Sequence, residues 1–315
     1  MKTGLRELQN EIQFKFPELE EQRLKSKKYY DTGIGLIIIG LIAFVYLLVT
    51  GESLSKFLAF FGLLIYILII HFLTKPRLAY ENYFNKIKQP FLYQLLSLIE
   101  KSIEYKDHEL PLEEIQETQL FKERYIRDKI VRIEDYFEGC YRNVNFKVME
   151  IDFGYSNTHK VDAFKPSVLF IADFNKRLKF QTFVKEYNFF NKYNNDKRDT
   201  NIITSPRGHK LTLENTDFEY IFQTHATDEI EGRYVLSFSI MEKILSIKEN
   251  LGDKSKLYIS FLENKVSFLL YNKKNFEPVL TSSISNDKTF ERFYKEIKQI
   301  LEIIDELKLN EKIWS

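Results

Sequence analysis

The 315-residue chain is poor in cysteine: Cys140 is the only one, so no disulfide can form within the chain. One thiol also excludes a zinc site built from several cysteines, and it gives no sign of an oxidising compartment. Cys140 lies in the stretch "FEGCYRN", which contains no histidine. We therefore interpret it as a small structural residue and not as a nucleophile.

An excess of charge is also lacking, because 46 lysines and arginines balance 45 aspartates and glutamates to a net charge of +1. Without a strong positive field, no nucleic-acid partner is expected. The P-loop, the dinucleotide-binding glycine motif, the zinc-protease motif and the hydrolase serine motif are all absent from the sequence. The motifs therefore predict no catalytic residue, no metal and no cofactor.

Two long apolar runs without charge are present, Gly33–Val49 ("GIGLIIIGLIAFVYLLV") and Phe57–Leu73 ("FLAFFGLLIYILIIHFL"). At about 1.5 Å per residue, each run with its flanks reaches roughly the 30 Å of a bilayer's hydrocarbon layer. Apolar residues on every side of such a helix leave no polar stripe for a soluble surface. With the short connection "GESLSK", the runs predict a transmembrane hairpin over residues 32–75, with helices at about 33–50 and 56–74. The alternative is a pair of buried helices in a soluble protein.

The charges beside these runs predict their orientation. Basic residues gather before the first run and after the second, whereas the connection holds only Lys56. By the positive-inside rule, both termini then face the cytoplasm of a bacterial inner membrane, with two spans. A cleaved leader peptide does not fit, because a charged segment precedes the first run and a second run follows it. The flanking basic residues are Arg23, Lys25, Lys27, Lys28, Lys75, Arg77, Lys86 and Lys88.

The remaining segments differ in periodicity. Residues 1–31 are predicted to form an amphipathic helical segment, and residues 76–130 a helical connector. From about residue 131 apolar residues alternate as in strands, and Glu263-Asn264 between two such runs predicts a hairpin turn. A helix over residues 288–309 closes the chain. The pattern predicts an α+β fold over residues 131–315, a cytoplasmic domain of antiparallel sheet with segregated helices.

Several stretches in the C-terminal two-thirds make the chain similar to a bacterial membrane family known as domain of unknown function 3137. The resemblance covers about residues 100–315 and implies two membrane helices ahead of the domain, but it implies no activity. Where the family pattern leads us to expect a proline that opens a helix, this chain has Phe238. The matching stretches are "LFKERY" (120–125), "IEDYFEG" (133–139), "FKPSVLFIADFNK" (164–176), "DFEYIFQTHATDEIEGRYVLSFSIMEKIL" (217–245), "NFEPVL" (275–280) and "LKLNEKIWS" (307–315).

The acidic stretch "HATDEIEGRY" (225–234) is the main candidate for a ligand or partner surface. Asp228 and Glu231 can supply an acid and a base, and Arg233 can hold an anion. Glu134 and Asp135, from another stretch of the resemblance, can join them in space. Together these carboxylates would form an oxygen-rich site able to hold Mg²⁺ or Ca²⁺.

A structural interpretation of the same stretch is stronger. It ends a strand in a polar turn, where Gly232 permits a tight backbone and Arg233 forms an ion pair with one of the acids. Ser237 or Ser239 then caps the helix that follows, and Ser239 with Glu242 has the spacing of a capping box. The stretch "SPRGHK" (205–210) can contact phosphate through its basic side chains, but a turn with solvated charges explains it equally well. Those side chains are Arg207, His209 and Lys210.

Two functions of different classes follow from these patterns. The first is a membrane-anchored, non-enzymatic interaction or scaffold module in contact with the lipid bilayer and with a protein partner or a second copy of itself. The second is a membrane-tethered enzyme, or a domain that binds a divalent ion or another ligand, using the acidic residues named above. The second requires the two acidic stretches to meet in the fold.

Overall fold

A computed structural model describes residues 17–51, 62–68, 92–106 except 94 and 98, 112–122, 126, 130–155, 162–174, 177–186, 207–252, 255–271, 283, 287–307 and 309. The chain divides into two compact units. One comprises Met1–Gln94 with Glu277–Arg292, and the other comprises Leu95–Phe276 with Phe293–Ser315.

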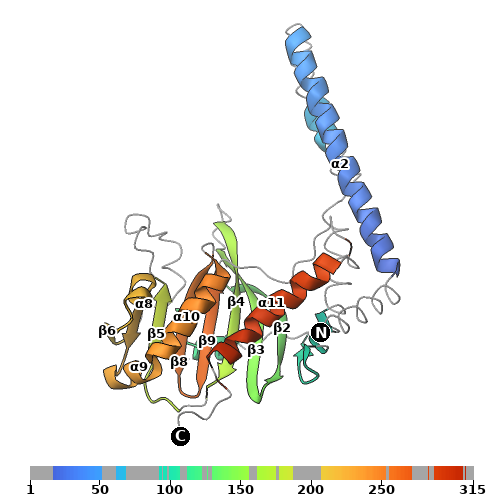
Figure 1. The fold of residues 1–315 in the computed structure, drawn as a ribbon. Helices are drawn as coiled ribbons and strands as arrows, with labels where there is room; N and C mark the ends of the chain where they lie inside the picture. Colours follow the sequence, from blue (N-terminus) through green and yellow to red (C-terminus); the bar gives the residue numbers. More distant parts are fainter. Residues whose placement is uncertain are drawn as a thin grey trace. The chain divides into compact units, whose positions relative to one another are not determined.

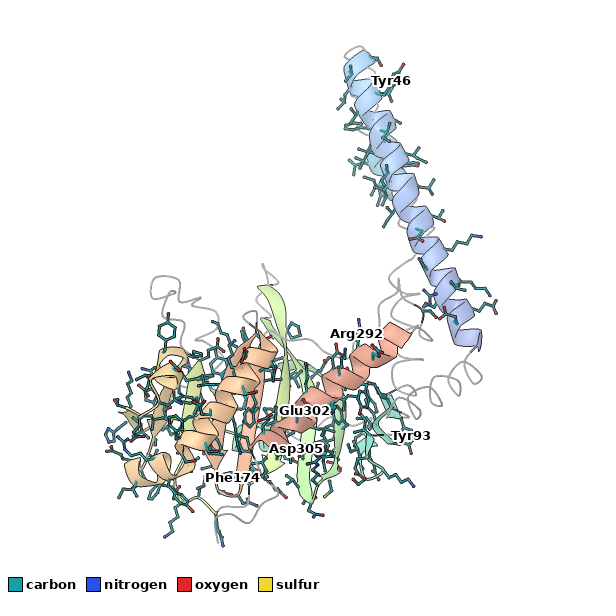
Figure 2. The ribbon with its side chains drawn as sticks, in the orientation of Figure 1. Tyr46, Tyr93, Phe174, Arg292, Glu302 and Asp305 are labelled. Atoms are coloured by element: carbon teal, nitrogen blue, oxygen red, sulfur yellow. The ribbon has the colours of Figure 1, made fainter. Side chains whose placement is uncertain are left out.

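A long helix, α2 (Pro17–Thr50), dominates the first unit. Proline suits the first turn of a helix, because the missing N–H would have no partner there. Within α2, the 20 residues Asp31–Thr50 are apolar and long enough to cross a bilayer. Only 6% of the most apolar 18-residue stretch of this segment is buried. Figure 2 shows side chains projecting all around this helix, and Val49 is 77% exposed. In the described part of the chain, this is the one helix with the length and composition of a membrane span.

The second apolar run is described only over residues 62–68, which are helical. Here the run touches α2, because the Tyr66 hydroxyl donates a hydrogen bond to the carbonyl oxygen of Leu36 at 3.0 Å. Gly40 makes the approach possible, since a Cβ at that position would lie 2.2 Å from the Tyr66 ring. The two runs are therefore adjacent at this point. The remainder of the second run and the connection after Gly51 lie outside the described residues, so the predicted hairpin is described only in part.

The second unit contains a nine-stranded sheet in the order β1-β2-β3-β4-β9-β8-β5-β7-β6, with antiparallel neighbours throughout (Figure 1). The predicted α+β class with an antiparallel sheet is confirmed. The strands are β1 (Glu104–Tyr105), β2 (Ile130–Tyr141), β3 (Val144–Tyr155), β4 (Asp162–Asp173), β5 (Thr182–Glu186), β6 (His209–Leu211), β7 (Phe222–Ala226), β8 (Lys256–Leu262) and β9 (Lys265–Tyr271). The helices are α5 (Leu112–Glu117), α8 (Thr216–Ile221), α9 (Glu229–Val235), α10 (Phe238–Leu251) and α11 (Asp287–Glu306).

Tight turns join two pairs of neighbouring strands. Glu263 and Asn264 connect β8 to β9, with Glu263 at a φ of +55°, which confirms the hairpin predicted there. Arg142 and Asn143 connect β2 to β3 with φ values of +50° and +66°. Positive φ at both central residues is the geometry that matches the twist of the strands in a two-residue hairpin.

The sheet has two unlike faces. α10 and α11 cross one of them, here called the helix face (Figure 1). Its core contains successive phenylalanines on four adjacent strands, Phe137, Phe146, Phe170 and Phe268, with ring centroids 6.1–6.3 Å apart. The opposite face, here called the cavity face, buries Met149, Leu169, Leu269 and Tyr258 together with Ile115 of α5.

The helical connector predicted over residues 76–130 is wrong at Glu104–Tyr105, which form strand β1, and its residues 76–91 lie outside the described residues. Residues 112–131 have helical periodicity, yet α5 ends at Glu117. The Thr118 hydroxyl donates to the carbonyl oxygen of Ile115 and accepts from the backbone of Leu120, and Gln119 has a φ of +52°. A hydroxyl that bonds the backbone in this way competes with the helical hydrogen bonds. Leu120 is thereby buried in the core.

Candidate functional site

The acidic stretch after β7 forms a helix, not the polar turn that we predicted. Asp228 is the N-cap of α9, and its carboxylate accepts a hydrogen bond from the backbone nitrogen of Glu231 at 2.8 Å. An aspartate in this position satisfies one of the N–H groups that a helix leaves without a partner in its first turn. The role that the structure gives to Asp228 is therefore to start a helix.

Glu231 and Arg233 hold α9 to its surroundings. The Glu231 carboxylate accepts from the backbone nitrogens of Lys179 at 3.2 Å and Phe180 at 2.8 Å, which fixes the segment ahead of β5. Arg233 pairs with Glu229 at 3.0 Å and Glu214 at 2.9 Å. The Arg233 side chain is 38% exposed, so water screens these pairs and each contributes little to stability. The predicted ion pair of Arg233 is confirmed.

The residues around α9 correct two further expectations. Gly232 is needed for packing: a Cβ there would lie 2.6 Å from the Leu211 side chain and 2.7 Å from that of Ala226. α10 begins at Phe238, after Ser237, but the Ser237 side chain makes no capping hydrogen bond. The capping box predicted for Ser239 is wrong as well, because the Glu242 carboxylate accepts from the side-chain amide of Asn215 at 2.5 Å.

The second acidic pair lies on β2, near the opposite edge of the sheet. Asp135 sits in a β-bulge at a φ of +49°; it is buried, and its carboxylate accepts from the Tyr105 hydroxyl at 3.0 Å. Glu134 is opposite Glu150 of β3 in the register. β2 and β7 are six strand spacings apart in the sheet, which at about 4.8 Å per spacing gives roughly 29 Å. The structure therefore does not bring Glu134 and Asp135 together with Asp228, Glu231 and Arg233.

The basic residues of "SPRGHK" lie at the edge of the sheet, where Lys210 is adjacent to His225. Arg207, His209 and Lys210 are exposed, and Lys210 of β6 is opposite His225 of β7. Burial, followed by the charges of Lys210 and Lys185, lowers the pKa of His225 below its usual 6.5. His225 is therefore mainly neutral at pH 7, and the positive charge here belongs to the lysines.

A cavity of about 560 Å³ opens on the cavity face, where β2, β3, β4, β8 and β9 come to one end beside α5. No sequence motif predicts this cavity, since its lining comes from six separate segments. Only the strand register, which places Lys147, Ile171, Ser267 and Ser260 in one row across the sheet, assembles them. Its other charged and polar lining residues include Ser102, Glu114, Glu117, Glu138, Cys140, Asn145, Asp173, Glu263 and Lys265.

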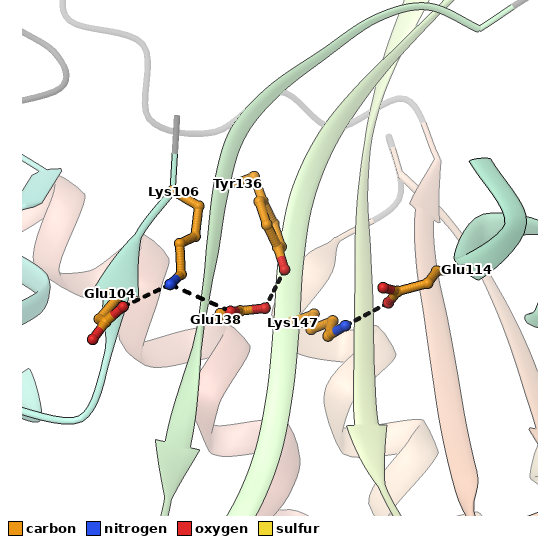
Figure 3. A network of polar contacts seen from close by, with 6 residues as sticks. All are labelled: Glu104, Lys106, Glu114, Tyr136, Glu138 and Lys147. Atoms are coloured by element: carbon orange, nitrogen blue, oxygen red, sulfur yellow. Dashed lines mark hydrogen bonds and ion pairs between the residues drawn. The ribbon is translucent and has the colours of Figure 1, made fainter. Parts of the chain in front are cut away.

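Ion pairs line this cavity and extend beyond it (Figure 3). Lys147 in its floor pairs with Glu114 of α5 at 2.5 Å. Lys106, outside the lining, lies between Glu104 at 2.7 Å and Glu138 at 3.6 Å. Lys106 lowers the pKa of the Glu104 carboxyl by its hydrogen bond and its charge.

A tyrosine completes the network. The Tyr136 hydroxyl donates to the Glu138 carboxylate, and burial together with this carboxylate raises the pKa of Tyr136 well above its ordinary value. Tyr136 therefore stays protonated at neutral pH and donates to Glu138. One oxygen of Glu138 is thereby occupied, while Lys106 reaches the other only at 3.6 Å.

Comparison with known proteins gives one family and one solved structure. Residues 167–309 match the family model described as "Protein of unknown function (DUF3137)". The crystal structure of the mycobacterial trehalose monomycolate transport factor A, TtfA, is similar with a TM-score of 0.32 and 9% sequence identity, over 65% of this chain and 88% of that chain. No protein with a curated description matches the chain.

Proposed function

We propose that this chain, whose residues 167–309 match the family model described as "Protein of unknown function (DUF3137)", is a membrane-anchored, non-enzymatic interaction module. In this proposal the two apolar runs form a transmembrane hairpin with both chain termini in the cytoplasm. The sheet domain then lies at the inner membrane and binds a protein partner. A tether of this kind raises the effective concentration of the domain near other membrane proteins.

The exposed apolar surface of α2 carries the proposal of a membrane anchor. Ile38, Ile42 and Val49 are 51%, 65% and 77% exposed. Removing apolar surface from water is favourable by about 25 cal/mol for each Å². A helix with such side chains all around it is therefore much more stable in lipid than in water. The contact of Tyr66 with Leu36 supports a partner helix from the second run.

A second exposed apolar group supports the choice of a protein partner. Ile230 and Tyr234 lie four residues apart on α9, and Phe238 opens α10 three residues after the end of α9; they are 81%, 47% and 61% exposed. We call them the α9 surface. The segment 214–242 around it carries seven acidic residues and one basic residue, Arg233. The seven acidic residues are Glu214, Asp217, Glu219, Asp228, Glu229, Glu231 and Glu242.

This combination fits a basic, amphipathic helix as the occupant of the α9 surface. Apolar side chains of such a helix would cover Ile230, Tyr234 and Phe238, while its lysines or arginines would face the surrounding carboxylates. In this proposal Asp228, Glu231 and Arg233 contribute to the rim of an interaction surface. Glu134 and Asp135 lie too far from it to take part.

Cysteine labelling tests the membrane topology. In a Cys140→Ser background, we expect Thr50→Cys at the end of α2 to react with a membrane-impermeant maleimide in intact spheroplasts. We expect Glu249→Cys, exposed on α10, to react only after permeabilisation. The Cys140→Ser parent controls for background labelling. Reaction of Glu249→Cys in intact spheroplasts, or release of the full chain by alkaline carbonate, would refute the proposed anchor.

The α9 surface is tested with a model peptide. The full chain in lipid nanodiscs is expected to bind a helical lysine–leucine peptide more tightly than the matching glutamate–leucine peptide. Phe238→Asp should weaken binding about tenfold, which corresponds to 1.4 kcal/mol, the order expected for one buried aromatic anchor. Leu112→Asp, at the exposed start of α5, is the control and should bind like the unmodified chain. Equal binding of both peptides would rule out the proposed partner chemistry.

A further inference from the structure

The cavity exists because two neighbouring rows of side chains on the cavity face differ in size. In the row nearer the strand centres, Met149, Leu169, Leu269 and Tyr258 fill the space against α5. In the next row, β9 and β8 present Ser267 and Ser260, which are 3% and 1% exposed. Protein interiors are normally packed without large voids. Two small residues side by side therefore leave a volume that only a ligand or solvent can fill.

The size of the cavity suits a small organic molecule. Its volume of about 560 Å³ lies inside the range of roughly 300–1,000 Å³ that is usual for ligand pockets. Its floor offers both kinds of contact that such a ligand needs. Ile171 and Leu262 provide apolar contact, and Ser260, whose hydroxyl accepts from the side-chain amide of Gln181 at 3.2 Å, provides a polar one.

The charge of the lining selects the class of ligand. Five acidic residues face two lysines, so the net charge is 2 − 5 = −3. Both lysines are already occupied, Lys147 by Glu114 at 2.5 Å and Lys265 by Glu117 at 3.5 Å. An anionic ligand would therefore have to compete with a carboxylate for either lysine of the lining. The acidic residues are Glu114, Glu117, Glu138, Asp173 and Glu263.

Three carboxylates of the lining remain outside these two ion pairs, Glu138, Asp173 and Glu263. Glu138 and Asp173 lie on strands and are the proposed anchors for a cation. Glu138 on β2 has one oxygen occupied by the Tyr136 hydroxyl and only a long contact, 3.6 Å, with Lys106. Asp173 on β4 accepts from the neutral amide of Asn145 at 2.9 Å. Glu138 and Asp173 come from strands separated by β3, so two charged ends of one flexible ligand can reach both.

We infer that this cavity binds an aliphatic polyamine. Its ammonium groups would bind Glu138 and Asp173, and its methylene chain would lie along Ile171 and Leu262. A metal ion fits less well, because the described residues contain no group of three side chains placed to coordinate one. The ligand site and the α9 surface are built from different residues, so either can fail without the other.

Cys140 provides a direct readout, because it lines the cavity and is the only thiol of the chain. In the full chain in nanodiscs of neutral lipid, we expect a cationic thiosulfonate to modify Cys140 about tenfold faster than an anionic thiosulfonate of similar size, since a charged cleft concentrates ions of opposite sign. Spermidine should slow the modification in proportion to its occupancy. Sodium chloride of equal ionic strength, which only screens the charges, should slow it much less.

Two variants and a control make the test specific. Glu138→Gln combined with Asp173→Asn should lower the preference for the cationic reagent and remove the protection by spermidine. Ser267→Leu should fill the cavity and abolish protection without changing a charge. Glu249→Gln, on the exposed side of α10, should change nothing. Circular dichroism checks that each variant remains folded.

The outcomes separate the sources of the ammonium group. Protection by spermidine but not by tetralysine supports a free polyamine. Protection by tetralysine alone would overturn the polyamine and indicate a peptide side chain. Equal rates for both thiosulfonates, or protection that survives Ser267→Leu, would overturn the ligand site itself.

Discussion

Replacing Lys248 by alanine is expected to destabilise the sheet domain by about 3–5 kcal/mol, because it leaves a carboxylate buried without its partner. Lys248 of α10 and Glu186 of β5 are 10% and 12% exposed, and their charged atoms lie 3.1 Å apart. The Lys248 ammonium also donates to the carbonyl oxygens of Gly252 at 3.0 Å and Ser255 at 2.6 Å. The Glu186 carboxylate accepts from the backbone of Leu257 at 2.8 Å. This pair therefore joins the end of α10 to two strands.

Urea unfolding of the full chain in detergent micelles, followed by near-UV circular dichroism, measures this effect. Lys179→Ala is the control, because this exposed lysine has no such role and should change the stability by less than about 0.5 kcal/mol. In the double variant Lys248→Met, Glu186→Leu, most of the lost stability should return, since an apolar pair of similar volume leaves no buried charge. A loss below about 1 kcal/mol for Lys248→Ala would show that water reaches the pair.

Local patterns in the sequence carry much of the fold. The charge-free run from Gly33 is predicted as a candidate membrane helix from the sequence alone. Apolar residues on all sides of a helix form a local pattern that does not depend on the tertiary fold. The hairpin at Glu263-Asn264 was predicted for a similar reason, since two alternating runs meet at two polar residues. The start of α10 at Phe238 and the closing helix α11 also follow from local signals.

Helix boundaries set by side-chain hydrogen bonds were harder to predict. The stretch "FEYIFQTH" (218–225) has the pattern of a strand, yet residues 218–221 belong to α8, whose N-cap Asn215 accepts from the backbone of Phe218 at 3.0 Å. Asp228 starts α9 in the same way. In both places an Asn or Asp cap outweighs the β propensity of the aromatic and branched residues that follow it. The caps were present in the sequence and would have been the signal.

The candidate site depended on strand order, which the sequence does not contain. Glu134 and Asp228 both lie in stretches that resemble the family, so they were grouped as one possible site. β2, which holds Glu134, is second in the sheet, and β7, which precedes Asp228, is eighth, since β8 and β9 insert between β4 and β5. The cavity was missed for the same reason. Its floor combines β3 with β8 and β9, more than 100 residues later in the chain.

The family model matches only part of the sheet. Residues 167–309 begin inside β4 and include β5 to β9 with α8 to α11, whereas β1, β2 and β3 precede the match. The α9 surface lies wholly within the matched part. The proposed polyamine site takes Asp173, Ser260 and Ser267 from the matched part and Glu138 from β2. The α9 surface therefore belongs to the matched part, although Phe238 stands where the family pattern predicts a proline, whereas the polyamine site extends beyond the matched part.

Replacing Phe268 by alanine is expected to lower the free energy of unfolding by about 3–5 kcal/mol. Phe268 of β9 is fully buried on the helix face, and its ring lies 6.1 Å from that of Phe170. Phe170 continues the row to Phe146 and Phe137 on β3 and β2. Removal of one ring leaves a cavity in the middle of this row, because rigid strands on both sides cannot move together to close it.

Phe238→Ala provides the matched control, since it deletes the same atoms from a side chain that is 61% exposed. The same urea unfolding should show a change below about 0.5 kcal/mol for Phe238→Ala. If Phe238 serves the α9 surface, this variant should nevertheless weaken binding of the lysine–leucine peptide. Phe268→Ala should weaken that binding only in proportion to the fraction of unfolded protein. Equal destabilisation by the two variants would contradict the distinction between a core ring and a surface ring on which the α9 surface depends.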